Sequence, residues 1–424
     1  MSPQEHTVVI GAGLAAAHTV EALREGGYDG RITLIGAEPD PPYERPPLSK
    51  DYLQGRQERE KAIVHDASWY RGRGIDLRLG RTATDLEAAS RTVVLDDGTG
   101  LEYTHLVLAT GAVPRRPGLP GEELPGVHVL RRFEDSEKLK EVFDAGGRLA
   151  VVGAGWIGLE VAASARQAGM EVTIVAPDDV PLAKVMGPEL GAYFAQLHHH
   201  QGVELRLGST VTGILERDGR AAGLQTSDGD VPADAVLLAV GAVPLTELAE
   251  GAGLEVGNGV VVDSRLRASE PGILAVGDVA NAQHATLGRL RVEHWDNAIR
   301  QGKLAAATIL GRDEVYDWQP YFFTDQFDLG MEYVGRGGPD ARTVVRGELE
   351  AGEFIVFWLD GDGAEGSDAG AGRGGAASGA SGAGTVAAAM NVNIWDVNDA
   401  LRALIGRSVD ADRLADPSIP LDEL

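Results

Sequence analysis

The sequence predicts an α/β protein in which one strand–turn–helix unit occurs twice and a smaller α+β domain follows. The segments "VVIGAGLAAAHTVEALR" at 8–24 and "VVGAGWIGLEVAASARQ" at 151–167 each combine a short apolar strand, a Gly-x-Gly turn and an apolar helix. After about Trp318, aromatic and apolar residues alternate in short stretches, which is typical of an antiparallel sheet. With 424 residues, the chain is long enough for two or three domains.

Both units continue in the same order along the chain. Residues 7–36 are expected to form strand, helix and strand, and 101–116 a later buried strand that ends in Thr-Gly-Ala. The second unit repeats this order from 147 to 244, where its last strand ends in Val-Gly-Ala. Two further helices are expected at 295–311 and 395–406.

Charge and cysteine content exclude several classes of function. A formal net charge of −26 at pH 7 disfavours nucleic acid and an anionic membrane surface as partners, because both would be repelled. The absence of cysteine excludes disulfides, thiolate metal sites, protein-ligated iron–sulfur clusters and redox-active thiol pairs. The three histidines at 198–200 point in different directions on a helix, so we expect a solvated helix end there and no metal site.

The amino-terminal region predicts a cytoplasmic protein. A strand that begins by about Thr7 leaves no room for a signal peptide. The sequence also lacks an apolar run of about 18 residues, the length needed to span a bilayer.

The first Gly-x-Gly turn has the spacing of a dinucleotide-binding fingerprint. Gly11 allows the tight turn, Gly13 lets the backbone approach a pyrophosphate, and Ala16 permits close packing of helix on strand. The next strand ends in "TLIGAE", which places Glu38 where it would accept hydrogen bonds from a ribose diol.

The second turn carries the same fingerprint with glycine at all three positions, Gly153, Gly155 and Gly158. Aligning "TIVAPD" on "TLIGAE" places Asp178 opposite Glu38. A carboxylate at this position favours NADH over NADPH, whereas Lys184 is a nearby cation that argues for a 2′-phosphate. Two fingerprints predict two dinucleotides, and the useful pair is FAD in the first unit and NAD(P)H in the second.

Several further motifs resemble one known family. These are "YERPPLSKDYL" at 43–53, Thr-Gly-Ala at 110–112, "GWIGLE" at 155–160, "LAVGDVA" at 274–280 and "VEHWDNAIRQG" at 292–302. Together they are similar to the FAD-dependent ferredoxin reductases that serve bacterial Rieske oxygenases and cytochromes P450. The apoptosis-inducing factor belongs to the same wider group, which also contains disulfide oxidoreductases with redox cysteines.

The resemblance implies two Rossmann-like, three-layer domains of the glutathione-reductase type and a C-terminal interface domain. The FAD-binding domain would comprise 1–113 and 242–317, and the NAD(P)-binding domain 114–241. The interface domain would comprise 318–424, with a flexible Gly-rich hairpin loop at 361–384.

The resemblance also implies roles for individual residues. Lys50 would lie near the flavin N5 and stabilise negative charge on the reduced ring. Glu160 would pair with Lys50 and, together with Glu293, contact the nicotinamide carboxamide. Arg45 would lie near the FAD phosphates or ribityl chain, and Asp278 would bind the ribityl chain. The other cofactor-binding residues that the resemblance implies are Ala83, Thr110, Gly111, Ile157, Gly241, His294, Trp295 and Phe323.

One segment departs from the family pattern. Many oxygenase reductases have Trp-x-Trp-Ser-Asp-Gln beside the flavin, whereas this chain has Tyr-Phe-Phe-Thr-Asp-Gln at 321–326. Phe323 would still shield the ring, but the indole hydrogen bonds are lost. This difference leaves open which electron acceptor docks.

The expected function is NADH-dependent reduction of FAD by hydride transfer, followed by single-electron transfer to a ferredoxin-type iron–sulfur protein. Arginines at 115, 116, 131 and 132 would supply a local basic patch for an acidic ferredoxin. The alternatives are an NADH oxidase or reductase of a quinone or other small acceptor, and a slow redox sensor similar to the apoptosis-inducing factor. The oligomeric state is left open between monomer and homodimer.

Overall fold

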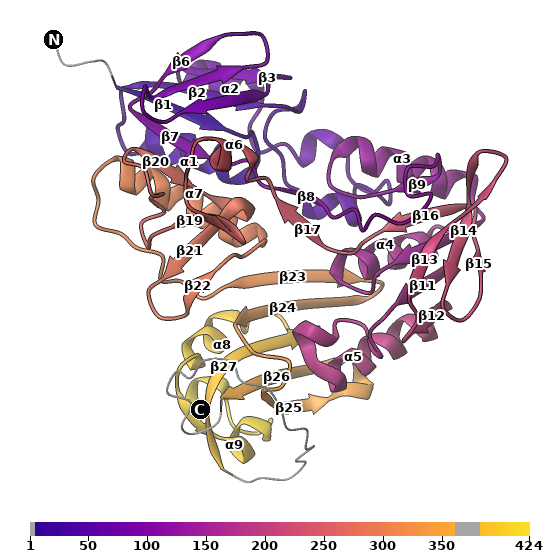
Figure 1. Cartoon of the computed structure of the whole chain (residues 1–424). Coiled ribbons are helices and arrows are strands. Elements are labelled where there is room, and N and C mark those ends of the chain that lie inside the picture. Colours follow the sequence, from indigo (N-terminus) through magenta and orange to yellow (C-terminus); the bar gives the residue numbers. More distant parts are fainter. Residues whose placement is uncertain (1–4, 361–381) are drawn as a thin grey trace. The chain divides into compact units, whose positions relative to one another are not determined.

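A computed structural model describes residues 5–360 and 382–424 of the chain, which divide into two units (Figure 1). The first unit comprises Met1–Arg115, Leu130–Lys140 and Gly241–Trp318. The second comprises Arg116–Val129, Glu141–Val240 and Gln319–Leu424. Among the described residues, none of the helices combines the length and the apolar character needed to cross a membrane.

The first unit is built on a parallel sheet in the order β20-β7-β1-β2-β3. Its strands are β1 (His6–Ile10), β2 (Arg31–Gly36), β3 (Ile75–Leu79), β7 (His105–Leu108) and β20 (Ile273–Ala275). Strand β1 is buried throughout and β7 is buried after its half-buried first residue, as expected when both faces of a parallel sheet are covered. Because β20 pairs with β7, the segment after residue 241 completes the sheet that the first 115 residues begin.

Helices α1 (Leu14–Glu25) and α7 (Trp295–Ile309) pack closely against each other in this unit. A Cβ on Gly302 of α7 would lie 2.4 Å from the carbonyl oxygen of Ala15, so glycine at this position permits the close approach of the two helices. The expected helix at 295–311 is confirmed as α7.

Smaller elements complete the first unit. Its antiparallel three-stranded sheet contains β4 (Ala83–Glu87), β5 (Thr92–Leu95) and β6 (Gly100–Glu102). A four-stranded sheet contains β18 (Val256–Gly257), β19 (Gly259–Val262), β21 (Ala280–His284) and β22 (Gly288–Leu290), and β8 (Ala112–Pro114) pairs with β17 (Ala242–Pro244). The helices are α2 (Ala67–Gly72), α6 (Glu247–Gly251) and the start of α3 (Phe133–Ala145), with the 3-10 helices η1 (Pro46–Ser49), η2 (Arg59–Lys61) and η3 (Gly277–Val279).

The second unit contains a parallel sheet of matching design, in the order β12-β11-β10-β16-β9. Its strands are β9 (Val127–His128), β10 (Arg148–Val152), β11 (Glu171–Ala176), β12 (Val203–Leu207) and β16 (Ala235–Leu238), with helices α4 (Trp156–Gln167) and α5 (Ala183–His200). A small antiparallel sheet adds β13 (Val211–Arg217), β14 (Arg220–Thr226) and β15 (Val231–Pro232). In both parallel sheets the strand before the Gly-x-Gly turn lies between the second strand and a later one, so the repeated unit predicted from the sequence is confirmed.

The carboxyl-terminal part of the second unit is an antiparallel sheet, in the order β23-β24-β27-β26-β25 (Figure 1). Its strands are β23 (Tyr321–Gln326), β24 (Leu329–Gly335), β25 (Arg342–Glu348), β26 (Glu353–Asp360) and β27 (Ala383–Val392), and β28 (Ser408–Asp410) pairs with β27. Helices α8 (Asn398–Leu404) and α9 (Ala411–Ala415) and the 3-10 helices η4 (Leu349–Ala351) and η5 (Leu421–Glu423) complete it. The predicted α/β fold with a C-terminal α+β part is therefore confirmed.

Two boundaries predicted in this part were wrong. The helix expected from residue 395 begins only at Asn398, because Asn393 and Asp396 have φ values of 52° and 62° that turn the chain first. Most of the predicted loop at 361–384 lies outside the described residues. Its last two residues, Ala383 and Gly384, already belong to β27 and pair with β28.

Candidate functional site

The two Gly-x-Gly turns have the same backbone geometry. Gly11 and Gly153 both have φ of +101°, and each donates its N–H to the strand that follows its helix, to Ile35 O and Val175 O, each at 2.8 Å. A Cβ on Gly11 would lie 2.1 Å from the carbonyl oxygen of Ala109. A Cβ on Gly153 would meet the equivalent carbonyl, that of Ala239, at 2.5 Å. Both positions therefore require glycine for conformation and for space.

The second glycine of each fingerprint leaves the helix N-terminus accessible. Gly13 and Gly155 are the N-caps of α1 and α4, and a Cβ built on either would meet no described atom within 4 Å beyond those of the adjacent chain. Neither cap is closed by a described side-chain hydrogen bond, and the first turns of both helices carry no acidic residue. The backbone N–H groups of both first turns fit the pyrophosphate of a dinucleotide, which the structure does not contain.

The third positions bring each helix close to its strand. Ala16 is fully buried, and a Cβ on Gly158 would lie 2.4 Å from the carbonyl oxygen of Gly153. The two turns therefore differ in one methyl group here, and both retain the close strand–helix approach that the fingerprint needs.

Glu38 follows β2 and is held as a hydrogen-bond acceptor. Tyr43 Oη donates to Glu38 Oε2 at 2.5 Å, and Arg45 Nη2 donates to Glu38 Oε1 at 3.0 Å. Burial by itself raises the pKa of Glu38, but the Arg45 guanidinium and the Tyr43 hydroxyl outweigh burial and hold it below its usual range. The side chain is thus kept ionised, which fits the ribose-binding role predicted for it.

Asp278, in η3 after β20, pairs with Arg131. From the sequence, this arginine was expected in a basic patch for ferredoxin docking. Arg131 Nη2 donates to Asp278 Oδ2 at 2.6 Å, and the Nε of Arg131 is buried without a hydrogen-bond partner among the described residues. Arg132 lies 3.8 Å from the Glu38 carboxylate. Nothing in the sequence around Arg131 and Arg132 distinguishes them from ordinary surface arginines. They lie against carboxylates predicted to bind FAD.

The two predicted catalytic residues are anchored differently. Lys50 directly follows η1 as its C-cap, its N–H donates to the carbonyl oxygen of Pro47 at 3.0 Å, and two prolines fix the preceding path. Glu160, in α4, is 4% exposed and accepts a hydrogen bond from Thr324 Oγ1 at 2.6 Å. Lys50 belongs to the first unit and Glu160 to the second, and their pairing stays a prediction.

The chain segments that connect the two units carry three further predicted residues. Thr110 Oγ1 donates to the carbonyl oxygen of Leu245 at 2.8 Å, and Gly111, with φ of +72°, accepts from the N–H of Leu245. Gly241 has φ of +96° and accepts from the N–H of Arg115. These bonds hold the two connections side by side through β8 and β17.

The segment before α7 places three predicted residues together. Glu293 forms an ion pair with Arg291, His294 is the N-cap of α7, and Trp295 is its first residue. Burial lowers the pKa of His294 to about 4, with a smaller opposing effect of Asp278. His294 is therefore neutral at neutral pH. Ala83, the remaining predicted residue of this unit, is the half-buried start of β4.

In the second unit, Asp178 and Lys184 form an exposed ion pair. Lys184 Nζ lies 3.5 Å from Asp178 Oδ2, and the side chains are 80% and 39% exposed, so the pair contributes little to stability. Both groups therefore remain accessible for a ribose or a 2′-phosphate. Ile157, in the first turn of α4, is also exposed.

The aromatic residue that packs on α4 is Phe322. Its ring centroid lies 5.1 Å from that of Trp156, the first residue of α4. Because side chains alternate along a strand, Phe323 lies on the opposite face of β23. The shielding role assigned to Phe323 stays a prediction.

The prediction of a solvated helix end at 198–200 was wrong for His198. This residue is 0% exposed, and its Nε2 lies 2.8 Å from Gln326 Oε1. His199 and His200 are exposed, as expected. Among the described residues, no cluster of three or more His, Cys, Asp or Glu side chains could hold a metal.

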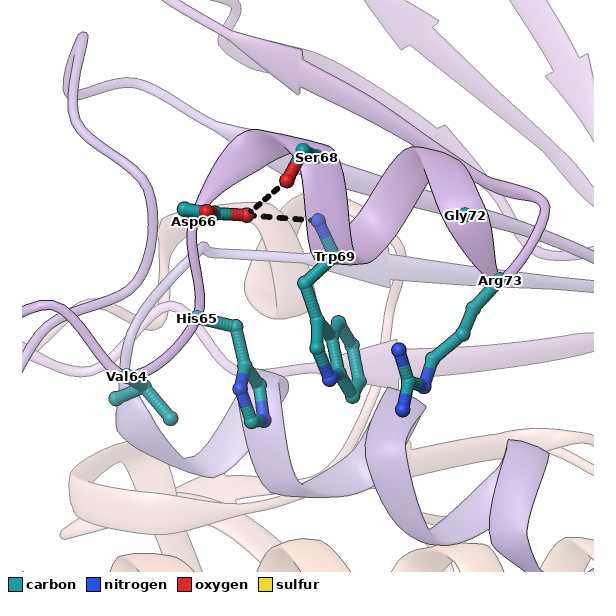
Figure 2. A pocket seen from close by; sticks show the side chains of 7 residues that line it. All are labelled: Val64, His65, Asp66, Ser68, Trp69, Gly72 and Arg73. Carbon is teal, nitrogen blue, oxygen red and sulfur yellow. Dashed lines mark hydrogen bonds between the residues drawn. The ribbon is translucent and has the colours of Figure 1, made fainter.

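The first unit has a pocket of about 460 Å³, and Figure 2 shows the residues that line it. The Trp69 indole lies between the His65 ring, stacked at 3.7 Å, and the Arg73 guanidinium, at 4.0 Å. Asp66 caps α2 by accepting from the N–H of Trp69. None of the predicted cofactor-binding residues lines this pocket, so we assign it no role in cofactor binding.

Known protein families and relatives match most of the chain. Residues 5–302 match the family described as pyridine nucleotide-disulphide oxidoreductase, and residues 321–370 match the reductase C-terminal family. The anthranilate 1,2-dioxygenase system ferredoxin–NAD(+) reductase component of Burkholderia cepacia is 39% identical over 98% of both chains. A ferredoxin–NAD(P)(+) reductase of a Sphingomonas species is 36% identical over 84% of this chain and 87% of its own.

A solved structure is also similar over nearly the whole length. The reductase in the covalent putidaredoxin reductase–putidaredoxin complex has a TM-score of 0.90 and 33% identity, covering 99% of this chain and 97% of its own. The resemblance to ferredoxin reductases stated from the motifs is confirmed. With its two glycine fingerprints and no cysteine, this chain belongs to the pyridine nucleotide-disulphide oxidoreductase family and is an oxidoreductase similar to its ferredoxin reductases.

Proposed function

We propose that the protein is an NADH-dependent, FAD-containing reductase that passes electrons to a ferredoxin-type iron–sulfur protein of an oxygenase or cytochrome P450 system. The observation that carries the proposal is the pair of equivalent Gly-x-Gly turns, each ahead of an uncapped helix N-terminus and each followed by a carboxylate after the next strand. The relatives named above support the identity of the acceptor.

In this proposal the first unit holds FAD. The N-terminus of α1 binds its pyrophosphate, Glu38 its adenosine ribose, and Asp278 with Arg45 the chain that leads to the flavin. Lys50, Glu293, His294 and Trp295 lie around the flavin ring, with Lys50 offering a positive charge to the reduced ring. Bound FAD supplies hydride acceptance from NADH and release of single electrons.

The second unit would hold the nicotinamide cofactor. The N-terminus of α4 binds its pyrophosphate, Asp178 its ribose diol, and Glu160 accepts a hydrogen bond from the carboxamide. This last contact orients the nicotinamide for hydride transfer, which depends more on orientation than on acid–base groups. A neutral His294 adds no charge to the flavin side at neutral pH.

We propose NADH rather than NADPH because Asp178 would repel a 2′-phosphate. The relative from Burkholderia cepacia is named for NAD(+), whereas the one from Sphingomonas is named for NAD(P)(+). The neighbouring Lys184 is the group that would have to accept a 2′-phosphate instead.

Three further expectations remain proposals. They are the cytoplasmic location, a monomeric or homodimeric state, and the domain boundaries 1–113, 114–241, 242–317 and 318–424. The docking patch of Arg115, Arg116, Arg131 and Arg132 also remains a proposal. Three of these arginines have carboxylate neighbours: Arg116 pairs with Glu123 at 3.3 Å, Arg131 with Asp278 at 2.6 Å, and Arg132 lies 3.8 Å from Glu38.

The function is tested by steady-state reduction of ferredoxins encoded near this gene, with NADH as donor. Dichlorophenolindophenol serves as a control acceptor that accepts electrons from most reduced flavoproteins. We expect activity with at least one ferredoxin and with the dye. Activity with the dye or a quinone but with none of the ferredoxins would contradict the proposed acceptor and favour a small-acceptor reductase.

A further inference from the structure

Four buried polar side chains form a continuous hydrogen-bonded chain in the second unit. Glu160 accepts from Thr324 Oγ1 at 2.6 Å, Thr324 Oγ1 accepts from Gln326 Nε2 at 3.2 Å, and Gln326 Oε1 lies 2.8 Å from His198 Nε2. The four side chains are between 0% and 4% exposed. Helices α4 and α5 supply its two ends, and β23 supplies its two middle members.

The chemistry of the four groups gives the chain a single direction. A carboxylate accepts hydrogen bonds and donates none, so the Thr324 hydroxyl must donate to Glu160. That hydroxyl then accepts from the Gln326 amide N–H, which turns the amide oxygen toward His198. His198 must therefore carry its proton on Nε2 and donate it to Gln326.

The surroundings of His198 agree with this assignment. Its Nδ1 is buried and has no hydrogen-bond partner within the described residues, so an unprotonated Nδ1 costs less than a stranded N–H donor. Burial lowers the pKa of His198 to about 4, which keeps the ring neutral at neutral pH. The Phe327 ring lies edge-on at 5.2 Å. As a neutral ring with one N–H donor, His198 can be the first donor of a series of hydrogen bonds that all point toward Glu160.

We propose that His198, Gln326 and Thr324 are positioning residues that fix the Glu160 carboxylate as an acceptor for the nicotinamide carboxamide. The inference rests on the proposed role of Glu160 and deepens it, because it assigns a function to the antiparallel sheet: β23 orients a carboxylate that α4 supplies. A chain of donors that all point toward one carboxylate strengthens each bond in it. Loss of Thr324 would remove its hydrogen bond to Glu160, and loss of Gln326 or His198 would weaken that bond.

The direction of the chain is tested without turnover, in the FAD-loaded protein. Nitrogen-15 NMR of histidine-labelled protein distinguishes the two tautomers, and His198→Gln identifies the His198 signals among those of ten histidines. We expect a protonated Nε2 and an unprotonated Nδ1 at neutral pH. The opposite tautomer would overturn the proposed direction.

The positioning role is tested by the rate of flavin reduction on mixing with saturating NADH. Thr324→Val removes the donor to Glu160, and we expect the limiting rate to fall about tenfold, with a smaller change in NADH affinity. Thr324→Ser keeps the hydroxyl and should restore most of the rate. His198→Leu should lower the rate about threefold, and His198→Gln, which keeps an N–H donor, should restore it.

A double-mutant cycle separates this role from a merely structural one. Because Thr324→Val already breaks the chain, adding His198→Leu should lower the rate no further. Independent, multiplying losses from the two substitutions would contradict the proposal, as would a Thr324→Val protein that reduces its flavin at the normal rate.

Two outcomes separate failure of this inference from failure of the proposed function. If Glu160→Ala, which removes the acceptor, leaves flavin reduction unchanged, then Glu160 does not orient the nicotinamide and the positioning role falls with it. Absence of ferredoxin reduction in a protein that NADH reduces rapidly would count against the proposed acceptor alone, since flavin reduction needs no acceptor.

Discussion

At the scale of single residues, the same type of side chain is held in three different environments. Glu38 is ionised because Arg45 and Tyr43 donate to it, and Glu160 is held by Thr324. Asp178 is paired only with the exposed Lys184 among the described ion pairs. Burial and hydrogen-bond donors hold Glu38 and Glu160 as acceptors, whereas Asp178 is accessible and its partner Lys184 is 80% exposed. Cofactor choice should therefore be the property most easily changed by substitution.

Substitution of Asp178 should change the preference between NADH and NADPH. Asp178→Arg removes a carboxylate that repels a 2′-phosphate and adds a guanidinium that pairs with it. We expect the ratio of kcat/KM for NADH over NADPH to fall by at least about tenfold. Asp178→Asn, which removes the charge alone, should give a smaller fall. A ratio that does not change in either variant would show that Asp178 does not bind the ribose.

His198 should make stability depend on pH. Its pKa is lowered from 6.5 to about 4 in the folded protein, so between these values the unfolded chain binds the proton and the folded chain does not. The folded state is therefore fully favoured above pH 6.5 and loses stability as the pH falls toward 4. The size of the effect is about 3 kcal/mol for His198.

Denaturant unfolding of the wild type and of His198→Gln, at pH 7 and at pH 4.5, measures this contribution. The variant lacks the titrating ring, so the difference in free energy of unfolding between the two proteins should shift in its favour at the lower pH. The same difference at both pH values would mean that His198 titrates alike in the folded and unfolded chains.

At the scale of elements, two glycines of the same turn, only two residues apart, have different roles. One is required by the fold and the other by the proposed cofactor binding. A methyl group on Gly153 would meet the carbonyl oxygen of Ala239, whereas one on Gly155 would meet no described atom within 4 Å. The first glycine is therefore required by the fold, and the second by whatever approaches the helix N-terminus. A pair of matched substitutions can distinguish these two requirements.

Gly153→Ala should reduce stability, and Gly155→Ala should reduce NADH binding. The positive φ and the contact at Gly153 should lower the free energy of unfolding by roughly 2 kcal/mol or more. Gly155 has φ of −86°, which alanine adopts without strain. Gly155→Ala should therefore unfold normally but raise the KM for NADH about tenfold, by obstructing the pyrophosphate. Equal loss of stability in both variants, or an unchanged KM in Gly155→Ala, would contradict this division.

Elements with local signals could be predicted from the sequence. The strand–turn–helix units, α7 and the C-terminal antiparallel sheet all follow from apolar periodicity and glycine placement. The start of α8 could not be predicted, because the left-handed Asn393 and Asp396 leave no mark on periodicity. Nor could the burial of His198, since its partner Gln326 is 128 residues away along the chain. Arg131 was missed as a partner of Asp278 for the same reason.

At the scale of the whole molecule, the chain contains two dinucleotide-binding folds of matching strand order in two units, and a C-terminal sheet that contacts one of them through Glu160. Two such folds in one chain fit hydride transfer from one bound dinucleotide to the other. The chain has no cysteine that could take part in this transfer. We therefore infer that electrons enter from NADH, pass to FAD and leave to an iron–sulfur protein.

Anaerobic stopped-flow absorbance tests this claim in two stages. The FAD-loaded protein is mixed first with NADH and then with an oxidised ferredoxin that is encoded near its gene. We predict loss of the oxidised flavin absorbance within milliseconds, followed by reduction of the ferredoxin cluster as the flavin absorbance returns. Slow flavin reduction with a long-lived charge-transfer band, or a reduced flavin that no ferredoxin reoxidises, would contradict the claim.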